Sequence, residues 1–173
     1  MGGGIDVDQV LGSRSTDLMS GLGPPPLRPG MMLPLGDPVG APGYADAVPQ
    51  VMLDKVIRMR LVLGPRDDTL TAEALELLRS SVYEVSSSSN RIALRLHGPK
   101  LTTRGAGQMP SEGIVLGAMQ VPSAGQPLIF LPDHPTTGGY PVVAVVHPDD
   151  LWMAGQVRPG TKIRFVLWKR SHS

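Results

Sequence analysis

The sequence of 173 residues contains no cysteine. This absence excludes disulfide bonds, thiolate nucleophiles and zinc held by cysteine ligands. A strong charge of one sign is absent as well, because the formal net charge is +1 at pH 7 and the pI is near 8.1. Such a balance shows neither the basic footprint of a nucleic-acid-binding protein nor an acidic tail. We therefore expect no nucleic acid among the partners.

Long apolar runs are missing too. A membrane-spanning helix needs roughly 18 or more apolar residues in succession, and no segment of the chain approaches that length. The first ten residues also lack the basic and then apolar layout of a secretory signal. We therefore expect no membrane contact and a cytoplasmic location.

Glycine and proline, in contrast, are abundant, with 21 and 18 residues. Both residue types disfavour helix interiors, so the composition indicates many short strands joined by turns. The length is typical of one folded unit with its own core. We expect a single domain over residues 1–173.

Alternation of polar and apolar residues predicts about seven strands, at residues 56–63, 82–85, 91–97, 114–121, 127–131, 142–146 and 162–168. The clearest helix follows capping residues at 67–71 and runs to about Ser80. Its buried stripe is formed by Leu70, Ala74, Leu75, Leu77 and Leu78. Shorter helices are expected at 17–21 and after 148–150. Because no βαβ alternation is present, we predict a mainly antiparallel β-barrel or sandwich with helices at its ends.

Residues 23–43 have proline or glycine at nearly every third position, so no regular element is expected there. Apolar residues are interspersed among them. We predict that these side chains lie against a core.

Several familiar chemical motifs are absent. The histidines, at 97, 134, 147 and 172, show no spacing typical of a metal site. The GGG at residues 2–4 is not followed by the lysine and helix of a phosphate-binding loop. No serine lies in a GxSxG turn, and no Met-Lys-Met biotinylation site is present. We therefore predict no metal, and no cofactor bound through a motif of this chain.

Two groups of polar residues remain as candidates for a binding site. Arg91 follows Asn90 at the start of a predicted strand, where its planar donors suit a carboxylate. The alternative is that Arg91 pairs with a nearby acid such as Glu84. The second group is the TTGGY sequence at residues 136–140, which combines two hydroxyls, two glycines and an aromatic ring. Glycines let a backbone approach a ligand, so we interpret it as a ligand-contacting loop.

Two further polar residues lie beside predicted strands. Glu112 can orient a substrate or take part in proton transfer. Gln120 can hydrogen-bond an amide or ureido group. Both can also be plain surface residues.

Seven short segments, in this order, are similar to the biotin-dependent carboxyltransferase domain family. They are residues 3–7 (GGIDV), 11–17 (LGSRSTD), 89–91 (SNR), 111–113 (SEG), 120–122 (QVP), 125–127 (GQP) and 136–141 (TTGGYP). The family includes allophanate hydrolase subunit 2, the C component of 5-oxoprolinase and the carboxyltransferase domain of urea amidolyase. The chain resembles only the C-terminal part of this two-lobed domain.

The resemblance implies a cyclophilin-like antiparallel β-barrel and a companion protein of the subunit 1 type, which is the B component in 5-oxoprolinase systems. It implies a subunit or fragment of a hydrolase or carboxyltransferase that processes a small amide or ureido compound, with ATP or biotin supplied through the partner. The alternative within the family is a non-catalytic regulatory module of the kinase-inhibitor-antagonist type.

The resemblance also implies roles for particular residues. Glu112 and Arg91 would be the catalytic residues. The substrate-binding residues would be Arg14, Asn90, Gln120, Thr136, Thr137, Gly138, Gly139 and Tyr140. In this arrangement Arg14, Asn90 and Arg91 hold a carboxylate. Glu112 and Gln120 position an amide, and the 136–140 loop covers the substrate.

Overall fold

The computed structural model describes residues 3–40, 52–105 and 109–168. By its internal contacts the chain divides into two compact units, Met1–Gln50 and Val51–Ser173. The expectation of one domain over residues 1–173 stays a prediction.

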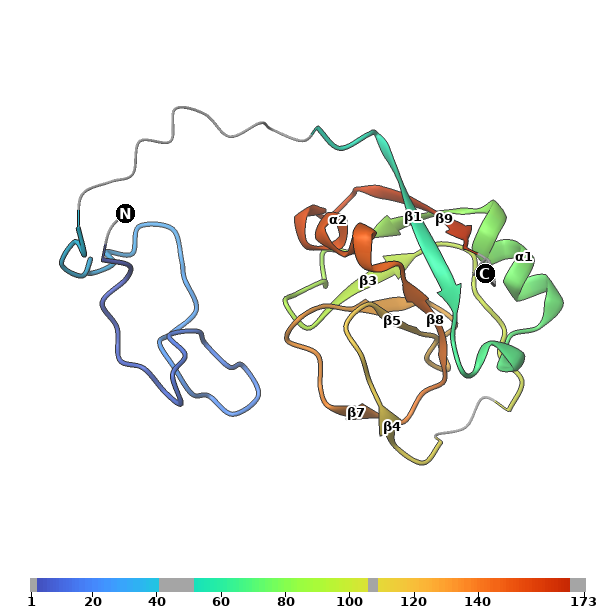
Figure 1. Ribbon diagram of the computed structural model, residues 1–173, viewed down its shortest axis with the longest axis horizontal. Coiled ribbons are helices and arrows are strands. Elements are labelled where there is room, and N and C mark those ends of the chain that lie inside the picture. Colours follow the sequence, from blue (N-terminus) through green and yellow to red (C-terminus); the bar gives the residue numbers. More distant parts are fainter. Residues whose placement is uncertain (1–2, 41–51, 106–108, 169–173) are drawn as a thin grey trace. The chain divides into compact units, whose positions relative to one another are not determined.

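The second unit is a closed barrel of seven strands (Figure 1). Around the barrel the order is β1-β8-β5-β6-β3-β2-β9. The strands are β1 (Val56–Leu63), β2 (Val82–Val85), β3 (Ala93–His97), β5 (Ala118–Gln120), β6 (Leu128–Phe130), β8 (Val142–Val146) and β9 (Lys162–Leu167). The prediction of a mainly β barrel with short helices is therefore confirmed.

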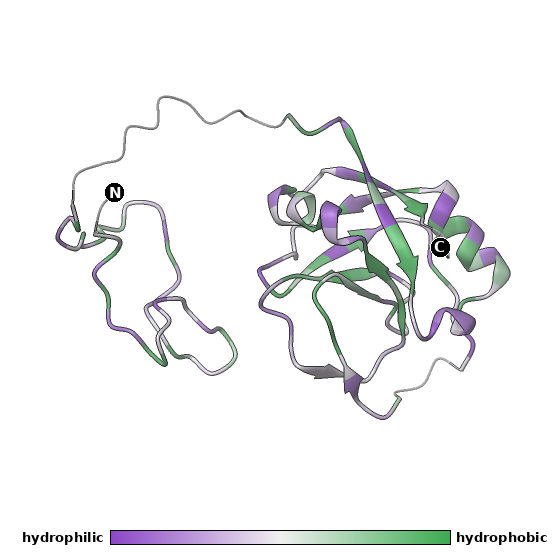
Figure 2. Cartoon of the chain, viewed as in Figure 1, coloured by the Kyte–Doolittle hydropathy of each residue, from purple (hydrophilic) through white to green (hydrophobic). Residues whose placement is uncertain are grey.

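Alternating residues of these strands fill the barrel. Along β1, Ile57, Met59 and Leu61 are at most 2% exposed, whereas Arg58 between them is exposed. Figure 2 shows the same pattern as apolar stretches on the barrel strands, interrupted by polar positions on β1. Burial of these side chains stabilises the fold by about 25 cal/mol for each Å² of apolar surface removed from water.

One strand pair departs from the antiparallel prediction. β1 and β9 run parallel, with six residue pairs in register from Val56↔Lys162 to Leu61↔Leu167. The six other neighbouring pairs around the barrel are antiparallel. Parallel neighbours need a long connection, and the whole of the remaining barrel connects these two strands. The parallel pair therefore closes the barrel.

The helices lie close to the predicted positions. α1 (Ala72–Ser80) is capped by Thr71, whose side chain accepts a hydrogen bond from the N–H of Ala74. Ala74 and Leu78 are buried and the rest of the predicted stripe packs against the barrel core. Short 3-10 turns, η1 (Asp67–Thr69) and η2 (Pro148–Asp150), precede α1 and α2 (Leu151–Gln156). The expected helix after 148–150 is confirmed.

A small two-stranded sheet projects from the barrel, below it in Figure 1. It pairs β4 (Glu112–Gly113) with β7 (Thr137–Gly138). We call residues 109–117 and 132–141, which contain these strands, the arm. A second apolar cluster, separate from the barrel interior, joins Ile114 of the arm to Ala93, Leu128 and Phe130 of the barrel strands. This side of the barrel sheet is therefore apolar on both faces.

The prediction of one strand over residues 114–121 is wrong in its first half. Gly117 has φ of +81°, which L-residues rarely adopt, and a Cβ there would lie 2.6 Å from Leu151 Cδ2. The turn at Gly117 ends the first arm segment, and only Ala118–Gln120 form a barrel strand.

Residues 3–40 contain isolated bridges, Ile5↔Leu35 and Val10↔Ser13, in place of long elements. The predicted helix at 17–21 is wrong: Gly21 N–H donates to Asp17 O, but Gly21 takes φ of +71° and stops the turn. The prediction that residues 23–43 lie against a core is not confirmed where the structure describes them. Leu27, Met32 and Val39 are 67%, 94% and 91% exposed.

Within the described residues, the helices are all too short and too polar to cross a membrane.

Tyr83 provides a test of the barrel interior. The residue is fully buried, its ring centre lies 5.7 Å from that of Phe165, and its hydroxyl has no hydrogen-bond partner among the described residues. Burial raises the pKa of this hydroxyl to about 12. Tyr83→Phe should therefore raise the free energy of unfolding by up to about 2 kcal/mol. Urea unfolding measures this change, and a lower free energy of unfolding would contradict a buried hydroxyl without a partner. Tyr83→Leu is the control for the ring. It should lower the free energy of unfolding by about 2 kcal/mol, because it replaces the ring by a smaller side chain.

An ion pair ties β1 to the turn before α2. The backbone N–H of Arg60 donates to Asp150 Oδ2 at 2.7 Å, and its guanidinium Nη2 donates to Oδ1 at 2.7 Å. Asp150 is only 6% exposed. Burial raises the pKa of this carboxyl, but the hydrogen bonds and charge of Arg60 outweigh burial, so the pKa is lowered overall. The same guanidinium lies 5.1 Å from the centre of the Trp168 ring.

Asp150→Asn should lower Tm at pH 7 by at least about 5 °C, since it leaves Arg60 without its main partner. Because the folded-state pKa lies below the unfolded value of about 3.9, the stabilisation is present above that pH and is lost as pH falls through the folded-state pKa. The Tm difference from wild type should therefore shrink as pH falls below the unfolded-state pKa of about 3.9. Thermal unfolding across pH checks this. Asp149→Asn is the control and should change Tm little, because the Asp149 side chain is 71% exposed. A Tm difference between Asp150→Asn and wild type that stays the same at all pH values would contradict the pairing.

Candidate functional site

Glu112 lies in β4, where the arm meets the barrel. The guanidinium of Arg66, just after β1, donates to its carboxylate, with Nε at 3.1 and 3.2 Å from the two oxygens. Arg66 Nη2 makes a further ion pair with Oε1. These bonds lower the pKa of the Glu112 carboxyl. Glu112 is thereby held as a half-buried carboxylate, which accepts hydrogen bonds and does not donate a proton at neutral pH.

Gln120, at the end of β5, is buried with 3% exposure. Its side-chain Nε2 donates to the backbone carbonyl of Tyr140 at 2.8 Å. The amide therefore fixes the end of the 136–140 loop. The prediction that Gln120 binds a substrate amide stays untested, and this contact assigns its side chain a positioning role.

The 136–140 loop is part of the arm. The N–H of Ile114 donates to Thr136 O at 2.9 Å, and the N–H of Met109 donates to Gly139 O at 2.9 Å. Thr136 and Thr137 are exposed, and Tyr140 is 41% exposed. The hydroxyls and the phenol are therefore presented to solvent on a backbone that is held on both sides.

Gly138 has a packing role that the sequence did not reveal. A Cβ at this position would lie 2.6 Å from Ile114 Cδ1 and 3.2 Å from Gln120 Nε2. Its φ is not in the left-handed region. The glycine is therefore needed for the close approach of Ile114 and Gln120, whereas the sequence suggested room for a ligand.

Asn90 and Arg91 precede β3. The side-chain oxygen of Asn90 accepts hydrogen bonds from the N–H groups of Ile92 and Ala93, at 2.9 and 3.2 Å. This local turn explains why β3 begins at Ala93 and not at Arg91 as predicted. Arg91 Nε lies 3.0 Å from Asp133 Oδ2, so an acidic partner comes from the arm, where the sequence suggested Glu84.

The connection between β6 and β8 contains one of the two groups of residues that the sequence predicted for the site, and it contacts the other. Asp133, near its start, contacts Arg91, and residues 136–140, near its end, contact Gln120 and the strand of Glu112. Arg14 belongs to the other unit, where its Nε donates to Val7 O at 3.1 Å. Its predicted role beside Asn90 and Arg91 stays a prediction.

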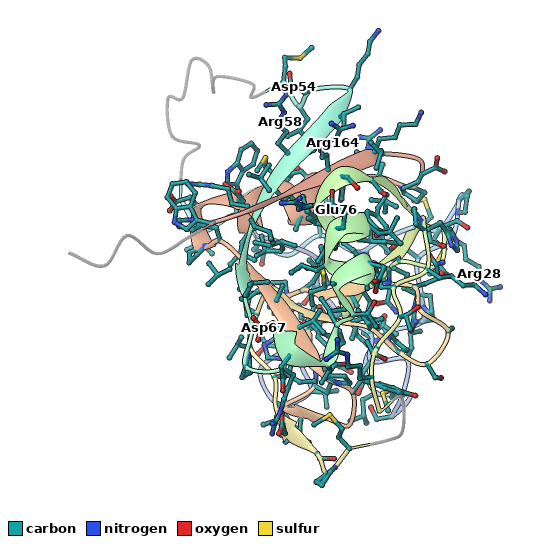
Figure 3. All side chains as sticks on the ribbon, turned by 90° about the vertical axis from the view of Figure 1, so that its right-hand side faces the viewer. Arg28, Asp54, Arg58, Asp67, Glu76 and Arg164 are labelled. Carbon is teal, nitrogen blue, oxygen red and sulfur yellow. The ribbon has the colours of Figure 1, made fainter. Side chains whose placement is uncertain are left out.

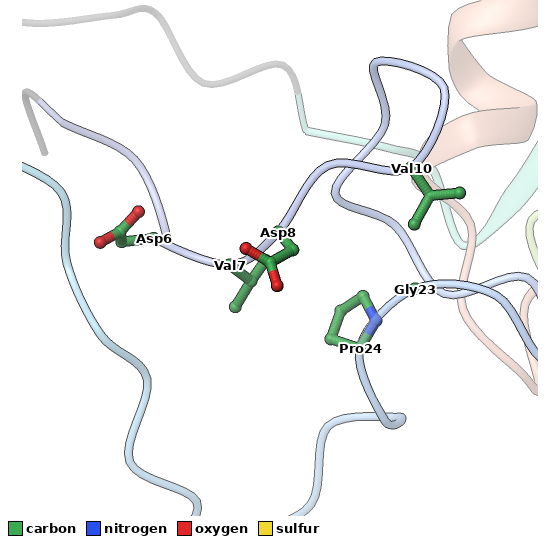
Figure 4. Close-up of a pocket in the computed structure, with 6 residues that line it drawn as sticks. All are labelled: Asp6, Val7, Asp8, Val10, Gly23 and Pro24. Atoms are coloured by element: carbon green, nitrogen blue, oxygen red, sulfur yellow. The ribbon is translucent and has the colours of Figure 1, made fainter.

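A pocket of about 510 Å³ lies within residues 3–40 (Figure 4). It is lined by Asp6, Val7, Asp8, Val10, Gly23 and Pro24. None of the residues predicted for the site lines it. In the part of the chain that the structure describes, no group of acidic and histidine side chains could hold a metal ion.

A second pocket, of about 220 Å³, lies on the barrel unit between the β2–β3 and β5–β6 loops. Its polar lining includes Ser88, Arg95, His97 and Gln126. None of these was a predicted site residue. The alternation of β3 places Arg95 and His97 on its outer face, and only the tertiary structure shows that two loops wall them in.

The comparisons with known sequences agree with the resemblance. A family model described as carboxyltransferase domain, subdomain A and B, matches residues 1–167. The chain is 35% identical over 167 residues to the C component of 5-oxoprolinase from Escherichia coli, covering 95% of this chain and 53% of that protein. It is 33% identical over 189 residues to urea amidolyase of Saccharomyces cerevisiae, covering 95% of this chain and 10% of that protein. The chain thus spans about half the length of the first relative and a tenth of the second.

Solved structures agree as well. The crystal structure of the K. lactis urea amidolyase superposes with a TM-score of 0.73 at 29% identity, covering 97% of this chain and 12% of that one. The Kluyveromyces lactis urea carboxylase superposes with a TM-score of 0.71 at 28% identity, covering 97% and 17%.

The contacts of Gly138 predict a matched pair of variants. Gly138→Ala should lower the free energy of unfolding by about 1 kcal/mol, because Ile114 must move to admit the methyl group. Gly113→Ala is the control, because it lies in the facing strand with nothing within 4 Å of its Cβ position. It should leave stability unchanged within about 0.5 kcal/mol. Urea unfolding of both variants checks this, and equal effects would contradict a specific contact at Gly138.

Proposed function

Because the chain belongs to the carboxyltransferase domain family, we propose that it forms part of an enzyme that processes small amides, as a subunit of the 5-oxoprolinase type. The observation that carries this proposal is the 35% identity to the C component of a 5-oxoprolinase along 95% of the chain. The substrate in this proposal is 5-oxoproline, a five-membered lactam that bears a carboxylate. Hydrolysis adds water across its amide C–N bond and yields glutamate.

The ionised Glu112 is suited to orienting the amide of the substrate. A carboxylate whose pKa is lowered by Arg66 accepts a hydrogen bond from a lactam N–H without taking its proton. Arg66 keeps the acceptor in one orientation through two donors. We assign Glu112 the orientation of the substrate amide, in place of general-acid chemistry.

Arg91 supports the recognition of negative charge. Its pair with Asp133 is exposed, with side chains 58% and 49% accessible. Exposed ion pairs are weak because water screens them, so a substrate or partner carboxylate can replace Asp133. The planar guanidinium then offers two parallel donors to that carboxylate.

The arm supports a covering role. Thr136, Thr137 and Tyr140 present hydroxyl groups from a loop whose ends are held by backbone hydrogen bonds and by Gln120. A held loop loses little conformational entropy when it contacts a ligand. We assign this loop contacts to the substrate.

The proposal includes a companion protein of the subunit 1 type, because the E. coli relative is named as one subunit among others. ATP bound there would supply the energy for opening the lactam. Biotin, a cytoplasmic location and the contribution of Arg14 remain predictions.

The test is the ATP-dependent hydrolysis of 5-oxoproline by the chain co-purified with its companion proteins, measured as glutamate released. Arg91→Gln should reduce kcat/KM at least about tenfold, since a charge-assisted bond is lost. Arg79→Gln is the control, because it breaks an exposed pair with Glu76 on α1, away from these residues. It should leave turnover unchanged.

Two results would overturn the proposal. One is stable co-purification with no turnover of 5-oxoproline, allophanate or urea, which would favour a regulatory binding module. The other is equal activity of wild type and Arg91→Gln, which would remove the proposed recognition of negative charge.

A further inference from the structure

The pocket of about 220 Å³ on the barrel lies next to the arm without being part of it. On the outer face of β3, Ala93 is buried in the apolar cluster that includes Ile114 of the arm, which we call the arm cluster. The next two outward positions are Arg95 and His97. Arg95 faces Leu128 of β6 in register. Leu128 belongs both to the pocket lining and to the arm cluster. The pocket is therefore the uncovered continuation of the surface that the arm covers.

Arg95 carries the free positive charge of this pocket. Its backbone is held, because its N–H donates to Ser89 Oγ at 2.9 Å and its carbonyl accepts from the N–H of Ser86 at 2.8 Å. Among the described residues its guanidinium has no ion-pair partner. A held strand therefore presents an unpaired guanidinium to the pocket.

The wall opposite β3 is largely apolar. It comes from the β5–β6 loop, with Pro122, Ala124 and Pro127. The side chain of Gln126 bonds both the N–H and the carbonyl of Gly98 at 3.0 Å. Gln126 therefore joins this loop to the end of β3, and it keeps the wall in place.

We propose that this pocket binds a small monocarboxylate with a compact apolar body. Arg95 would hold the carboxylate through its planar fork of donors. Ser88 and His97, which also line the pocket, would supply further polar contacts. The prolines would pack against the apolar body. Drug-sized ligands occupy pockets of about 300 to 1,000 Å³, so a volume near 220 Å³ restricts the ligand to a few atoms beyond the carboxylate.

Charge around the pocket favours a single negative charge on the ligand. Glu84 is the register partner of His97 on β2, and Lys162 is in turn the register partner of Glu84 on β9. Glu84 and Lys162 carry opposite charges, and Arg95 is the one arginine or lysine among the residues that line the pocket. A monocarboxylate neutralises this single charge, whereas a dianion such as phosphate would carry a second negative charge that Arg95 leaves without a partner.

The identity of the ligand rests on the proposed function. 5-Oxoproline has the required parts, a carboxylate on a five-membered ring, and in that case the pocket holds the substrate at a place of its own next to the arm, apart from the carboxylate contact assigned to Arg91. The pocket itself is independent of turnover, so its ligand can be tested by binding alone.

The experiment is an NMR titration of the full chain, without ATP or companion proteins. Three probes of similar size are compared: 5-oxoproline, cyclopentanecarboxylate and 2-pyrrolidinone, which lacks the carboxylate. Both carboxylates should shift the backbone signals of residues 95–97 and 122–127, whereas 2-pyrrolidinone should not.

Matched variants assign the charge. Arg95→Gln should weaken binding of both carboxylates at least about tenfold, and Arg95→Lys should give an intermediate loss, because it keeps the charge without the fork. Arg164→Gln is the control. Figure 3 shows Arg164 beside Arg58, its register partner across β1 and β9, and it is likewise exposed with no ion pair among the described residues. It should bind as wild type does, and thermal unfolding of each variant confirms its fold.

The outcomes separate the two proposals. Carboxylate binding that depends on Arg95 supports the pocket, even if the assembled complex fails to hydrolyse 5-oxoproline. Binding of cyclopentanecarboxylate but not 5-oxoproline keeps the carboxylate pocket and removes the assigned substrate. Absence of binding by either carboxylate, or equal binding by wild type and Arg95→Gln, overturns the pocket, whatever the complex does with 5-oxoproline.

Discussion

The parallel pairing of β1 with β9 is the constraint on which the barrel unit depends. These strands are the first and last of the barrel, and their six pairs in register close it. Closure removes the exposed edges that an open sheet would present. It also sets the interior, because Ile57 and Met59 of β1 and Ile163 and Phe165 of β9 enter the same core. The Arg60–Asp150 pair and the Trp168 ring then join the end of this seam to the turn before α2.

A closed barrel normally has an apolar inside and a polar outside, and this one departs from that rule on one side. Ala93, Leu128 and Phe130 are apolar on the outer face, and they are buried in the cluster that includes Ile114 of the arm. Covering these apolar side chains is therefore a structural role of the arm, whatever its role in binding. The arm also carries Asp133 and residues 136–140. The segment that covers the outer face thus includes the 136–140 loop, which the family resemblance assigned to the site.

The charged groups around the arm differ in how firmly they are held. Glu112 is tied by Arg66 through several bonds, and its pKa is lowered. Arg91 forms an exposed ion pair with Asp133. Arg95 forms no ion pair among the described residues. Arg91 and Arg95 are therefore held less firmly than Glu112, and they can pair with a negative charge that a ligand brings.

The sequence by itself determined many of the local elements of the barrel unit. The bounds predicted for β1, β2 and β8 are those observed, and α1 begins at its predicted cap region, because alternation, helical spacing and capping act over a few neighbouring residues. The family and the mainly β barrel were also readable from short motifs. Only the tertiary structure decided the parallel closure, the pairing of Arg91 with Asp133, the packing role of Gly138 and the pocket around Arg95. Each of these depends on segments far apart in the chain, and their contacts arise from barrel closure and from the burial of an outer apolar face, which no local pattern specifies.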